Sequence, residues 1–287
     1  MGVIKKIIVI AMMALGGFSG YCQKNLTINV VSFNVRYNSP DDGINIWENR
    51  RDWVAGAMRF YEADLIGGQE VTYAQLVDMQ DRLPAFAHVG IGREGGNAGE
   101  FSPIFYRKDR FTLLKSDTFW LSETPGKVAV KGWDAALPRI VTWALFKDNE
   151  SGIEFYHFNT HFDHRGKEAR VQSAALIVAK VKAIAAGQPV VLTGDFNSNP
   201  ESKAYSTITT NGFDDSFTTV EATQSYGPAY TASGWDAVGR DASNRIDYVF
   251  LKNGTMPLRY HVLDGQRGNR YISDHFPVMV KVALPHN

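Results

Sequence analysis

Apolar and polar residues alternate along many short stretches of the chain, the pattern of β-strands with one buried face. The predicted strands are Leu26–Tyr37, Asp64–Glu70, Ser102–Tyr106, Phe111–Leu114, Ile140–Phe146, Gly152–Thr160, Pro189–Leu192, Arg245–Leu251 and Pro277–Val282. Most of them are bounded by Gly, Pro, Asn or Asp, which favour turns. The pattern therefore predicts many short strands spread over most of the chain.

Apolar residues spaced three or four apart predict helices between these strands. The predicted helices are Glu48–Tyr61, Thr72–Leu83, Lys167–Ala186 and Ser202–Thr210. In the second helix, Leu76, Val77 and Met79 are expected to face the core. Strands and helices do not alternate strictly, which favours sheets packed face to face with helices outside. With no repeat and no low-complexity linker, one domain is predicted over residues 25–284.

Composition narrows the class of protein without naming a function. The chain has 287 residues, of which 44% are apolar, as in ordinary globular proteins. Its 30 basic and 30 acidic residues balance to zero. This balance argues against a protein that coats nucleic acid, because such binding neutralises many phosphates with Lys and Arg.

The first 22 residues resemble a secretory signal peptide. Lys5 and Lys6 precede the apolar run Ile7–Leu15, and small residues follow. This run is too short for a stable membrane span, which needs ~20 apolar residues. Cleavage after Cys22, the sole cysteine, would place the mature protein in the periplasm or outside the cell. Lipidation of Cys22 is the alternative, although Tyr21 stands where a small residue is preferred.

Polar and titratable residues concentrate at or just after strand ends. The six clusters are Ser32–Arg36, Gly68–Glu70, His157–His161, Gly194–Asn197, Arg245–Tyr248 and Ser273–Pro277. A side chain at a strand end is accessible and yet rigidly aimed, which suits a binding or catalytic site.

Two of these clusters suggest acid–base chemistry. Asp195 and Asn197 are two residues apart, so on a strand they face the same side. A carboxylate there can hold a water or a metal, and an amide can donate to a phosphoryl oxygen, although the same spacing also occurs in turns. Asp274 and His275 point apart, and His275 with a distant acid such as Asp247 would form an oriented general base. A structural histidine beside a surface acid is the alternative.

Other residues suggest a hard divalent cation. Glu70 and Asn34 each end a strand, and with Asp274 they would provide the oxygen ligands that Mg²⁺ (or Mn²⁺) prefers. The histidines do not have the spacing of a zinc site, and the mature chain has no thiolate. A Gly-x-Ser-x-Gly elbow is also absent, which argues against a serine hydrolase.

Taken together and in this order, the six clusters resemble the endonuclease/exonuclease/phosphatase superfamily, the deoxyribonuclease-I-like metal-dependent phosphoesterases. The resemblance runs from Ser32 to Pro277. It implies an α/β (α+β) four-layer sandwich, with two packed, mostly antiparallel β-sheets flanked by helices. It also implies Mg²⁺- or Mn²⁺-dependent hydrolysis of a phosphodiester or phosphomonoester by in-line attack of an activated water.

The resemblance also implies roles for individual residues. The implied metal residues are Asn34, Glu70 and Asp274, and the implied catalytic residues are His161, Asp195, Asn197, Asp247 and His275. His161 would contact the phosphate and protonate the leaving group, and Glu100 would orient His161. Asp195 and Asn197 would orient water and bind phosphate. Asp247 would orient His275 as the base, with Asp195 as the other candidate for that role.

Departures from the family patterns indicate the branch. The mature chain lacks the disulfide of deoxyribonuclease I, and Thr72 stands where apurinic endonucleases have a lysine. Ser198 follows Asn197 where inositol-phosphate phosphatases have an arginine. The chain therefore resembles a bacterial secreted group related to the nocturnin-like deadenylase branch. Its candidate substrate contacts are Arg36, Tyr106, Arg139 and Arg165, with ion pairing as the alternative for the arginines.

The expected partner is a phosphate-ester substrate, either a small molecule or a short nucleic acid, and no protein partner is predicted. The lack of excess positive charge favours a short or small substrate over long duplex DNA. Two alternatives remain: a nuclease, acting as a 3′–5′ exonuclease or an endonuclease, and an inactive binding module on the same scaffold. Metal-dependent hydrolysis would separate the enzyme from the binding module.

Overall fold

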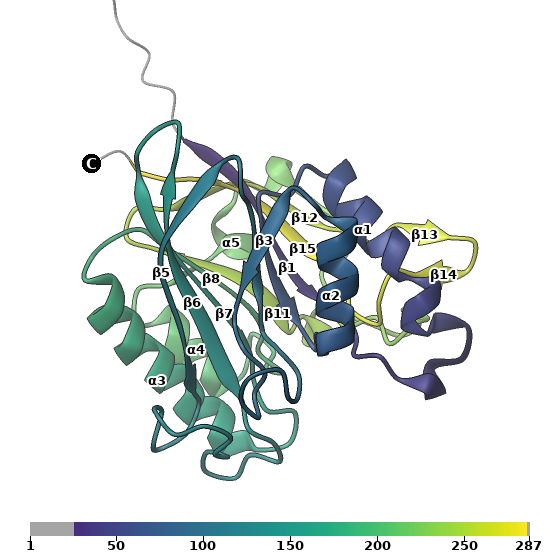
Figure 1. The fold of residues 1–287 in the computed structure, drawn as a ribbon, viewed down its shortest axis with the longest axis horizontal. Helices are drawn as coiled ribbons and strands as arrows, with labels where there is room; N and C mark the ends of the chain where they lie inside the picture. Colours follow the sequence, from purple (N-terminus) through teal and green to yellow (C-terminus); the bar gives the residue numbers. More distant parts are fainter. Residues whose placement is uncertain (1–25, 286–287) are drawn as a thin grey trace, which may run out of the picture.

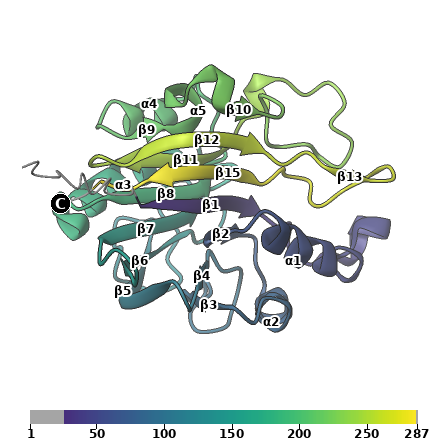
Figure 2. The same cartoon turned by 90° about the horizontal axis from the view of Figure 1, so that it is seen from above.

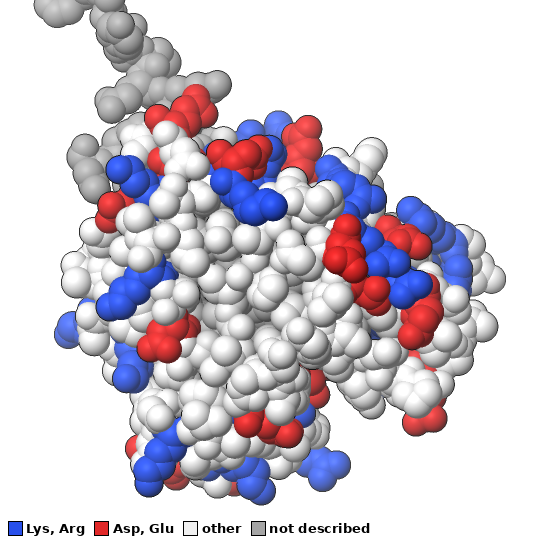
Figure 3. All heavy atoms as spheres, viewed as in Figure 1, with Lys and Arg blue, Asp and Glu red and all other residues white. Residues whose placement is uncertain are grey.

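The computed structural model describes residues 26–285, in which two β-sheets pack face to face with helices on their outer sides (Figures 1 and 2). The four-layer α/β sandwich predicted from the sequence is therefore confirmed. The predicted leader 1–22, including Cys22, lies outside the described residues. Within residues 26–285, no helix is both long and apolar enough to cross a membrane. On the face shown in Figure 3, basic and acidic side chains are intermixed.

The first sheet has the strand order β10-β12-β15-β1-β2-β4-β3. These strands are β1 (Thr27–Asn34), β2 (Leu65–Gln69), β3 (Phe86–Val89), β4 (Ile104–Arg107), β10 (Ser225–Tyr226), β12 (Met256–Val262) and β15 (Val278–Ala283). Strands β1 and β2 run parallel, and Asn34 pairs with Gln69. Their carboxyl ends therefore meet at one edge of the sheet.

The second sheet has the strand order β5-β6-β7-β8-β11-β9. These strands are β5 (Phe111–Trp120), β6 (Ile140–Asp148), β7 (Glu154–His161), β8 (Val190–Asp195), β9 (Asp214–Asp215) and β11 (Asp247–Lys252). In the register, Asp195 lies between His161 on one neighbouring strand and Asp247 on the other. A separate hairpin is formed by β13 (Gln266–Arg267) and β14 (Arg270–Tyr271).

Most strand pairs are antiparallel, as predicted, and the helices cover the outer faces of the two sheets. The α-helices are α1 (Arg51–Phe60), α2 (Tyr73–Arg82), α3 (Lys167–Ala185), α4 (Lys203–Thr209) and α5 (Ser216–Thr219). Short 3-10 helices are η1 (Pro40–Asn45), η2 (Trp47–Asn49), η3 (Ala222–Gln224) and η4 (Ala242–Asn244). Helices α1 and α2 pack on the first sheet, and α3 and α4 pack on the second.

Several local predictions need correction. Val77 is 44% exposed, and Gln75 is buried in its place because the Gln75 side chain completes a capping box with Thr72 at the start of α2. Strand β5 continues to Trp120 through polar residues, since it is an edge strand with one solvated face. Strands β3 and β12 were missed; β12 contains Pro257 and a register shift, which obscure its alternation.

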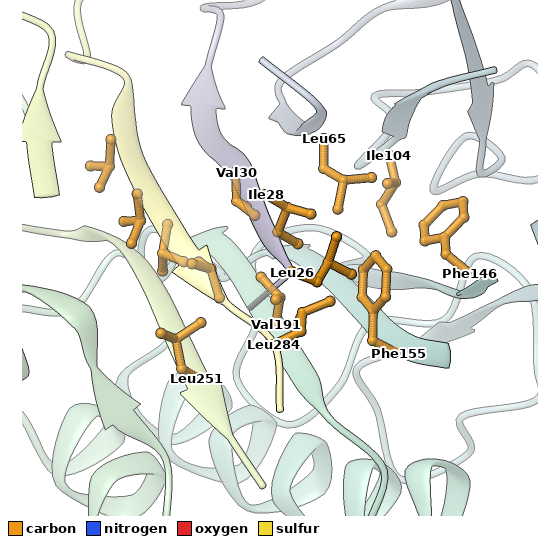
Figure 4. Packing of buried hydrophobic residues seen from close by; sticks show 14 of the residues in the cluster. Leu26, Ile28, Val30, Leu65, Ile104, Phe146, Phe155, Val191, Leu251 and Leu284 are labelled. Carbon is orange, nitrogen blue, oxygen red and sulfur yellow. The ribbon is translucent and has the colours of Figure 1, made fainter. Parts of the chain in front are cut away.

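Alternation along the strands separates three apolar clusters. In β1, Ile28 and Val30 face the second sheet, whereas Val31 and Phe33 face α1 and α2. The cluster between the two sheets is shown in Figure 4, where Val30, Leu65, Phe155 and Val191 are among the residues labelled. This cluster fixes the two sheets against each other.

A buried polar network lies between this apolar core and the carboxyl ends of β1, β2, β7 and β8. Gln69 Nε2 donates to Asn159 Oδ1 at 2.8 Å, and Thr193 Oγ1 donates to the same oxygen at 2.9 Å. His157 Nε2 lies 2.9 Å from Thr193 Oγ1, and Gly194 N donates to Ser32 Oγ at 3.0 Å. Buried hydrogen bonds rigidify the elements they join, so this layer fixes the strand ends that carry the site, although Gln69 Oε1 and His157 Nδ1 are without partners among the described residues.

Replacing Gly67 with alanine is expected to destabilise the fold strongly. A Cβ at this position would lie 2.1 Å from Thr193 Oγ1 and 2.6 Å from Asn159 Oδ1, so it would push the sheets apart and break the polar network. The expected cost is about 2–3 kcal/mol in the free energy of unfolding. Urea unfolding of G67A beside G126A, whose Cβ would meet nothing within 4 Å, checks this. Equal stability of both variants would contradict the packing.

His157 makes stability depend on pH. Burial lowers the pKa of His157 to about 3, so the folded protein keeps this ring neutral where the unfolded chain binds a proton. Between pH 6.5 and 3, the unfolded state therefore gains protons and stability falls as pH falls, by up to about 1.4 kcal/mol per pH unit from this residue. Unfolding of His157→Gln between pH 7.5 and 5 should show a shallower decline than the wild type. Equal slopes would contradict the assignment.

Candidate active site

A cavity of about 340 Å³ lies where the carboxyl ends of β1, β2, β7 and β8 meet. Its lining residues are Arg36, Tyr37, Glu70, Glu100, Leu137, Arg139, His161, His164, Asp195, Asn197, Asp274 and His275. Each strand directs alternate residues toward the space between the two sheets. In that space the side chains are apolar in the core and titratable at the carboxyl ends of these strands.

Asn34 connects two of the acids. Its Nδ2 donates to Glu70 Oε1 and to Asp195 Oδ2, both at 3.0 Å. Glu70 Oε2 also accepts a hydrogen bond from Tyr37 N at 3.0 Å. Carboxylates from two different sheets are thus held on one amide group, which fixes their separation.

Three residues of the cavity have a left-handed backbone without being glycine. Their φ angles are 61° for Arg36, 59° for Glu70 and 45° for Asn197. This region is unfavourable for residues with a Cβ, and such conformations persist when surrounding contacts enforce them. Each of the three lies one or two residues after a strand end, so the turn aims its side chain into the cavity.

His275 and Asp247 form a close pair, with 2.8 Å between Nδ1 and Oδ2. Burial disfavours the imidazolium, but the carboxylates of Asp247, Asp195 and Asp274 together outweigh burial and raise the pKa of His275 well above 6.5. Because Asp247 engages Nδ1, Nε2 is the ring nitrogen left for a substrate or water. The pair has the geometry of a general base oriented by an acid.

Asp195 lies at the centre of the site. Its Oδ2 is 3.5 Å from His161 Nε2 and 3.9 Å from His275 Nδ1, and its Oδ1 accepts from Asn197 N at 2.9 Å. Burial and the neighbouring Asp247 raise the pKa of Asp195 to about 7. Asp195 therefore exchanges protons near neutral pH, as a proton-transfer group requires.

His161 is held neutral. Burial and the nearby Arg139 lower the pKa of His161 well below 6.5, and Asn197 Nδ2 lies 3.0 Å from its Nε2. With the amide as donor, Nε2 is an acceptor and carries no proton. In this arrangement a proton on His161 would lie on Nδ1, and the role of His161 toward a leaving group stays a prediction.

Side chains that could ligate a divalent cation lie close together in the cavity. Ligand atoms of Glu70, His161 and Asp195 lie within 4.8 Å of one another, and Asp274 lines the same cavity. Burial and the nearby Glu70 raise the pKa of Asp274, because two carboxylates repel in the absence of a cation. The clustered carboxylates fit a hard divalent cation. Within the described part of the chain no cysteine lines the cavity, so a metal that prefers thiolate ligands would find none in it.

The predicted substrate contacts divide into two groups. Arg36 and Arg139 line the cavity; Arg36 is paired with Asp42 at 2.9 Å, and Arg139 Nη2 donates to His164 Nδ1 at 3.0 Å. Tyr106 instead packs on Phe146 at the interface of the two sheets, because it pairs with Leu65 at the opposite end of β2. Arg165 is exposed and does not line the cavity.

Glu100 has a different partner from the one expected. It forms an ion pair with Arg93 at 2.9 Å rather than a hydrogen bond with His161. Its pKa is raised, chiefly by burial. Arg93 and Glu100 line a separate small pocket beside Arg139, and of the two only Glu100 also lines the cavity.

Sequence reasoning missed His164, Tyr37 and Leu137. His164 is three residues after His161, and the Asp163 between them accepts hydrogen bonds from backbone N–H groups on both sides of the cavity wall, including Ala136 and Gly166. The repeated histidine in His-Phe-Asp-His was the available signal. Tyr37 and Leu137 occupy loops, and periodicity does not identify such residues.

Comparisons with known proteins agree with this geometry. A protein of the endonuclease/exonuclease/phosphatase family from Bacteroides vulgatus is 39% identical, with a TM-score of 0.87 over 91% of this chain and 100% of that chain. A mannosyl-6-phosphatase from Bacteroides thetaiotaomicron is 37% identical, with a TM-score of 0.84 over 90% and 100%. The catalytic domain of human nocturnin, at 18% identity and a TM-score of 0.69 over 91% and 96%, shares the fold. The profile of the Endonuclease/Exonuclease/phosphatase family matches residues 31–275, and the chain belongs to this family.

Proposed function

We propose that this protein is a divalent-metal-dependent phosphoesterase that hydrolyses a small phosphomonoester, with sugar phosphates as the substrate class. The observation that carries the proposal is the single cavity in which Glu70, Asp195 and Asp274 lie beside the His275–Asp247 pair. The mannosyl-6-phosphatase at 37% identity supports the choice of a sugar phosphate. The roles of the individual residues below are part of this proposal.

The size of the cavity favours a small substrate. Its volume of about 340 Å³ is near the lower end of ligand pockets, which span about 300–1,000 Å³. Long nucleic acids are usually bound along a continuous basic groove, whereas the face in Figure 3 mixes both signs of charge. The formal charge of zero agrees with this view.

Glu70, Asp195 and Asp274, with Asn34 beside them, would hold Mg²⁺ or Mn²⁺. Such a cation, when bound, neutralises negative charge on the phosphoryl oxygens and lowers the barrier to nucleophilic attack. Asn34 fixes the separation of the Glu70 and Asp195 carboxylates, since its amide group bonds to both. Cation binding would thus involve Glu70, Asp195 and Asp274, whereas proton transfer would involve the His275–Asp247 pair.

The His275–Asp247 pair accepts the proton of the attacking water. Asp247 holds Nδ1 at 2.8 Å and stabilises the imidazolium that forms, so Nε2 performs the transfer. In the metal-free protein the surrounding carboxylates keep His275 protonated. Ligation of Asp195 and Asp274 would weaken the part of this field that they supply, and His275 could then lose its proton and act as the base.

The arginines of the cavity bind the phosphoryl oxygens. Arg36 and Arg139 line the cavity and bring positive charge to it. Arg139 is 5% exposed and is held in place, since its Nε lies 3.5 Å from Asp163 Oδ2 and its Nη2 donates to His164 Nδ1. Donors fixed before the reaction stabilise charge that develops on oxygen in the transition state.

A substrate panel tests the proposal. Phosphate release is measured with Mg²⁺ or Mn²⁺ from mannose 6-phosphate, other hexose phosphates and p-nitrophenyl phosphate. Bis-p-nitrophenyl phosphate, single-stranded oligonucleotides and plasmid DNA are the comparison substrates. The proposal expects the highest kcat/KM among the sugar monoesters. Faster cleavage of oligonucleotides or plasmid would favour a nuclease, and inactivity on every substrate would favour a binding module.

A further inference from the structure

Arg50 is a buried arginine outside the cavity. It stands directly before α1 and its side chain is 1% exposed. Burial is the main cause that lowers the pKa of Arg50 to about 10, so the protein holds this cation at a cost. Purely apolar contacts at such a position would cost less, which suggests that the guanidinium itself has a purpose.

The guanidinium connects segments that are far apart in the sequence. Its Nη1 donates to Val35 O at 2.8 Å and to Ile272 O at 3.0 Å, and its Nε donates to Asn45 O at 2.6 Å. The rings of Trp47 and Trp235 lie 5.5 and 5.0 Å from Cζ. The planar group is therefore fixed in position and direction.

The carbonyls of Val35 and Ile272, which accept from Nη1, belong to segments that carry candidate metal residues. Val35 lies between Asn34 and Arg36, the residue with φ of 61°. Ile272 directly precedes Ser273 and Asp274. Ser273 Oγ donates to Asn34 O at 2.8 Å, which closes a second connection between the same two segments. The β1 turn and the Asp274 segment are thus joined through Arg50 and Ser273.

We propose that Arg50 is a positioning residue of the metal site, which holds the turn after β1 and the Asp274 segment at the separation that cation binding requires. This inference rests on the metal-dependent function proposed above. Arg50 lines no part of the cavity and acts on the site through two of the three carbonyls that it binds, those of Val35 and Ile272.

The sign of the effect distinguishes this role from two simpler ones. If Arg50 acted only through its charge, its removal would strengthen cation binding, because a positive charge near Glu70 and Asp274 would be lost. If Arg50 acted only in packing, its removal would lower the melting temperature and leave cation affinity unchanged. A positioning role predicts weaker cation binding.

The test measures Mn²⁺ affinity of the metal-free protein by calorimetry, without substrate. R50M keeps an unbranched apolar side chain as far as the position of Nε and removes the donors. We expect its Kd for Mn²⁺ to rise by about 10–100-fold, the range found for residues that orient metal ligands. For R50K, which keeps the charge, the Kd for Mn²⁺ is expected to rise by at least about three-fold, because one ammonium group cannot reproduce the planar guanidinium.

R110M is the matched control. Arg110 also joins β1 to other segments, but at the opposite end of the strand, where Nη2 donates to Thr27 O at 2.6 Å and Nε pairs with Asp148. R110M should therefore lower the melting temperature and leave the Kd for Mn²⁺ within about two-fold of wild type.

The outcomes separate the two proposals. Unchanged or tighter Mn²⁺ binding in folded R50M would overturn the positioning role and leave the proposed function intact. If R50M does not fold, R50K decides, and wild-type affinity in R50K overturns the role. If the wild-type protein binds no Mn²⁺, the metal-dependent function is wrong and the role of Arg50 is wrong with it.

Discussion

Replacing His275 with glutamine is expected to lower kcat for phosphomonoester hydrolysis by about 10²–10⁴-fold, the usual contribution of a general base. Glutamine keeps a donor that can reach Asp247, which is buried and lies 2.8 Å from His275 Nδ1. Alanine would leave that carboxylate without its partner and confuse loss of catalysis with loss of stability. The measurement is kcat at saturating substrate and Mg²⁺, together with the melting temperature.

His88→Gln is the control for this substitution. His88 is half-buried on β3 and bonds to Gln80 through Nδ1, away from the cavity. Its replacement should leave kcat within about three-fold of wild type. Near-normal kcat in folded H275Q would show that another group, with Asp195 as the first candidate, takes the proton of the water.

Replacing Glu70 with glutamine is expected to weaken Mn²⁺ binding by at least about 100-fold, because a directly ligating carboxylate contributes no less than the groups that orient ligands. Activity at low Mg²⁺ should fall accordingly and recover partly at high Mg²⁺. The variant loses like-charge repulsion with Asp274, but its amide NH2 group would face one of two donors, Asn34 Nδ2 or Tyr37 N. The melting temperature without metal therefore shows whether the variant stays folded.

The matched control is E100Q, since Glu100 lines the same cavity but is paired with Arg93 at 2.9 Å. Its Kd for Mn²⁺ should stay within about three-fold of wild type, as expected when only a neighbouring charge changes. Calorimetry and thermal unfolding of both metal-free variants give the comparison. Equal Mn²⁺ affinities of E70Q and E100Q would remove Glu70 from the metal site.

Strand alternation predicted much of the arrangement, because a site at strand ends depends on which residues share a face. Asn34, His161 and Asp195 follow apolar residues of the same parity on their strands, so all three point between the sheets. The six ordered clusters extended this reasoning to Asp247 and His275. The structure brings these side chains together, whereas their catalytic roles remain predictions.

Pairings between side chains of different loops could not be predicted from periodicity. Glu100 pairs with Arg93 through the fold of the loop around Gly92 and Gly99, and this loop has no regular repeat. Tyr106 was expected among the substrate contacts, on the strand that follows Glu100. Its antiparallel register with β2 carries it to the opposite end.

Long-range contacts explain the remaining differences. Arg50 bonds to Ile272, 222 residues away, and no local pattern marks it as buried. Gln75 is buried because its amide donates to Arg36 O, which displaces Val77 from the core-facing side of α2. Both residues support the loop that carries the site, and both depend on the tertiary structure.

The central claim is that one cavity binds a divalent cation and hydrolyses a small phosphomonoester. The most direct measurement is phosphate release from mannose 6-phosphate by protein treated with a chelator, before and after Mg²⁺ is restored. The account predicts no release from the chelated protein and full recovery when Mg²⁺ is added. Release that persists in the chelator, or its absence with Mg²⁺ and with Mn²⁺, would contradict it.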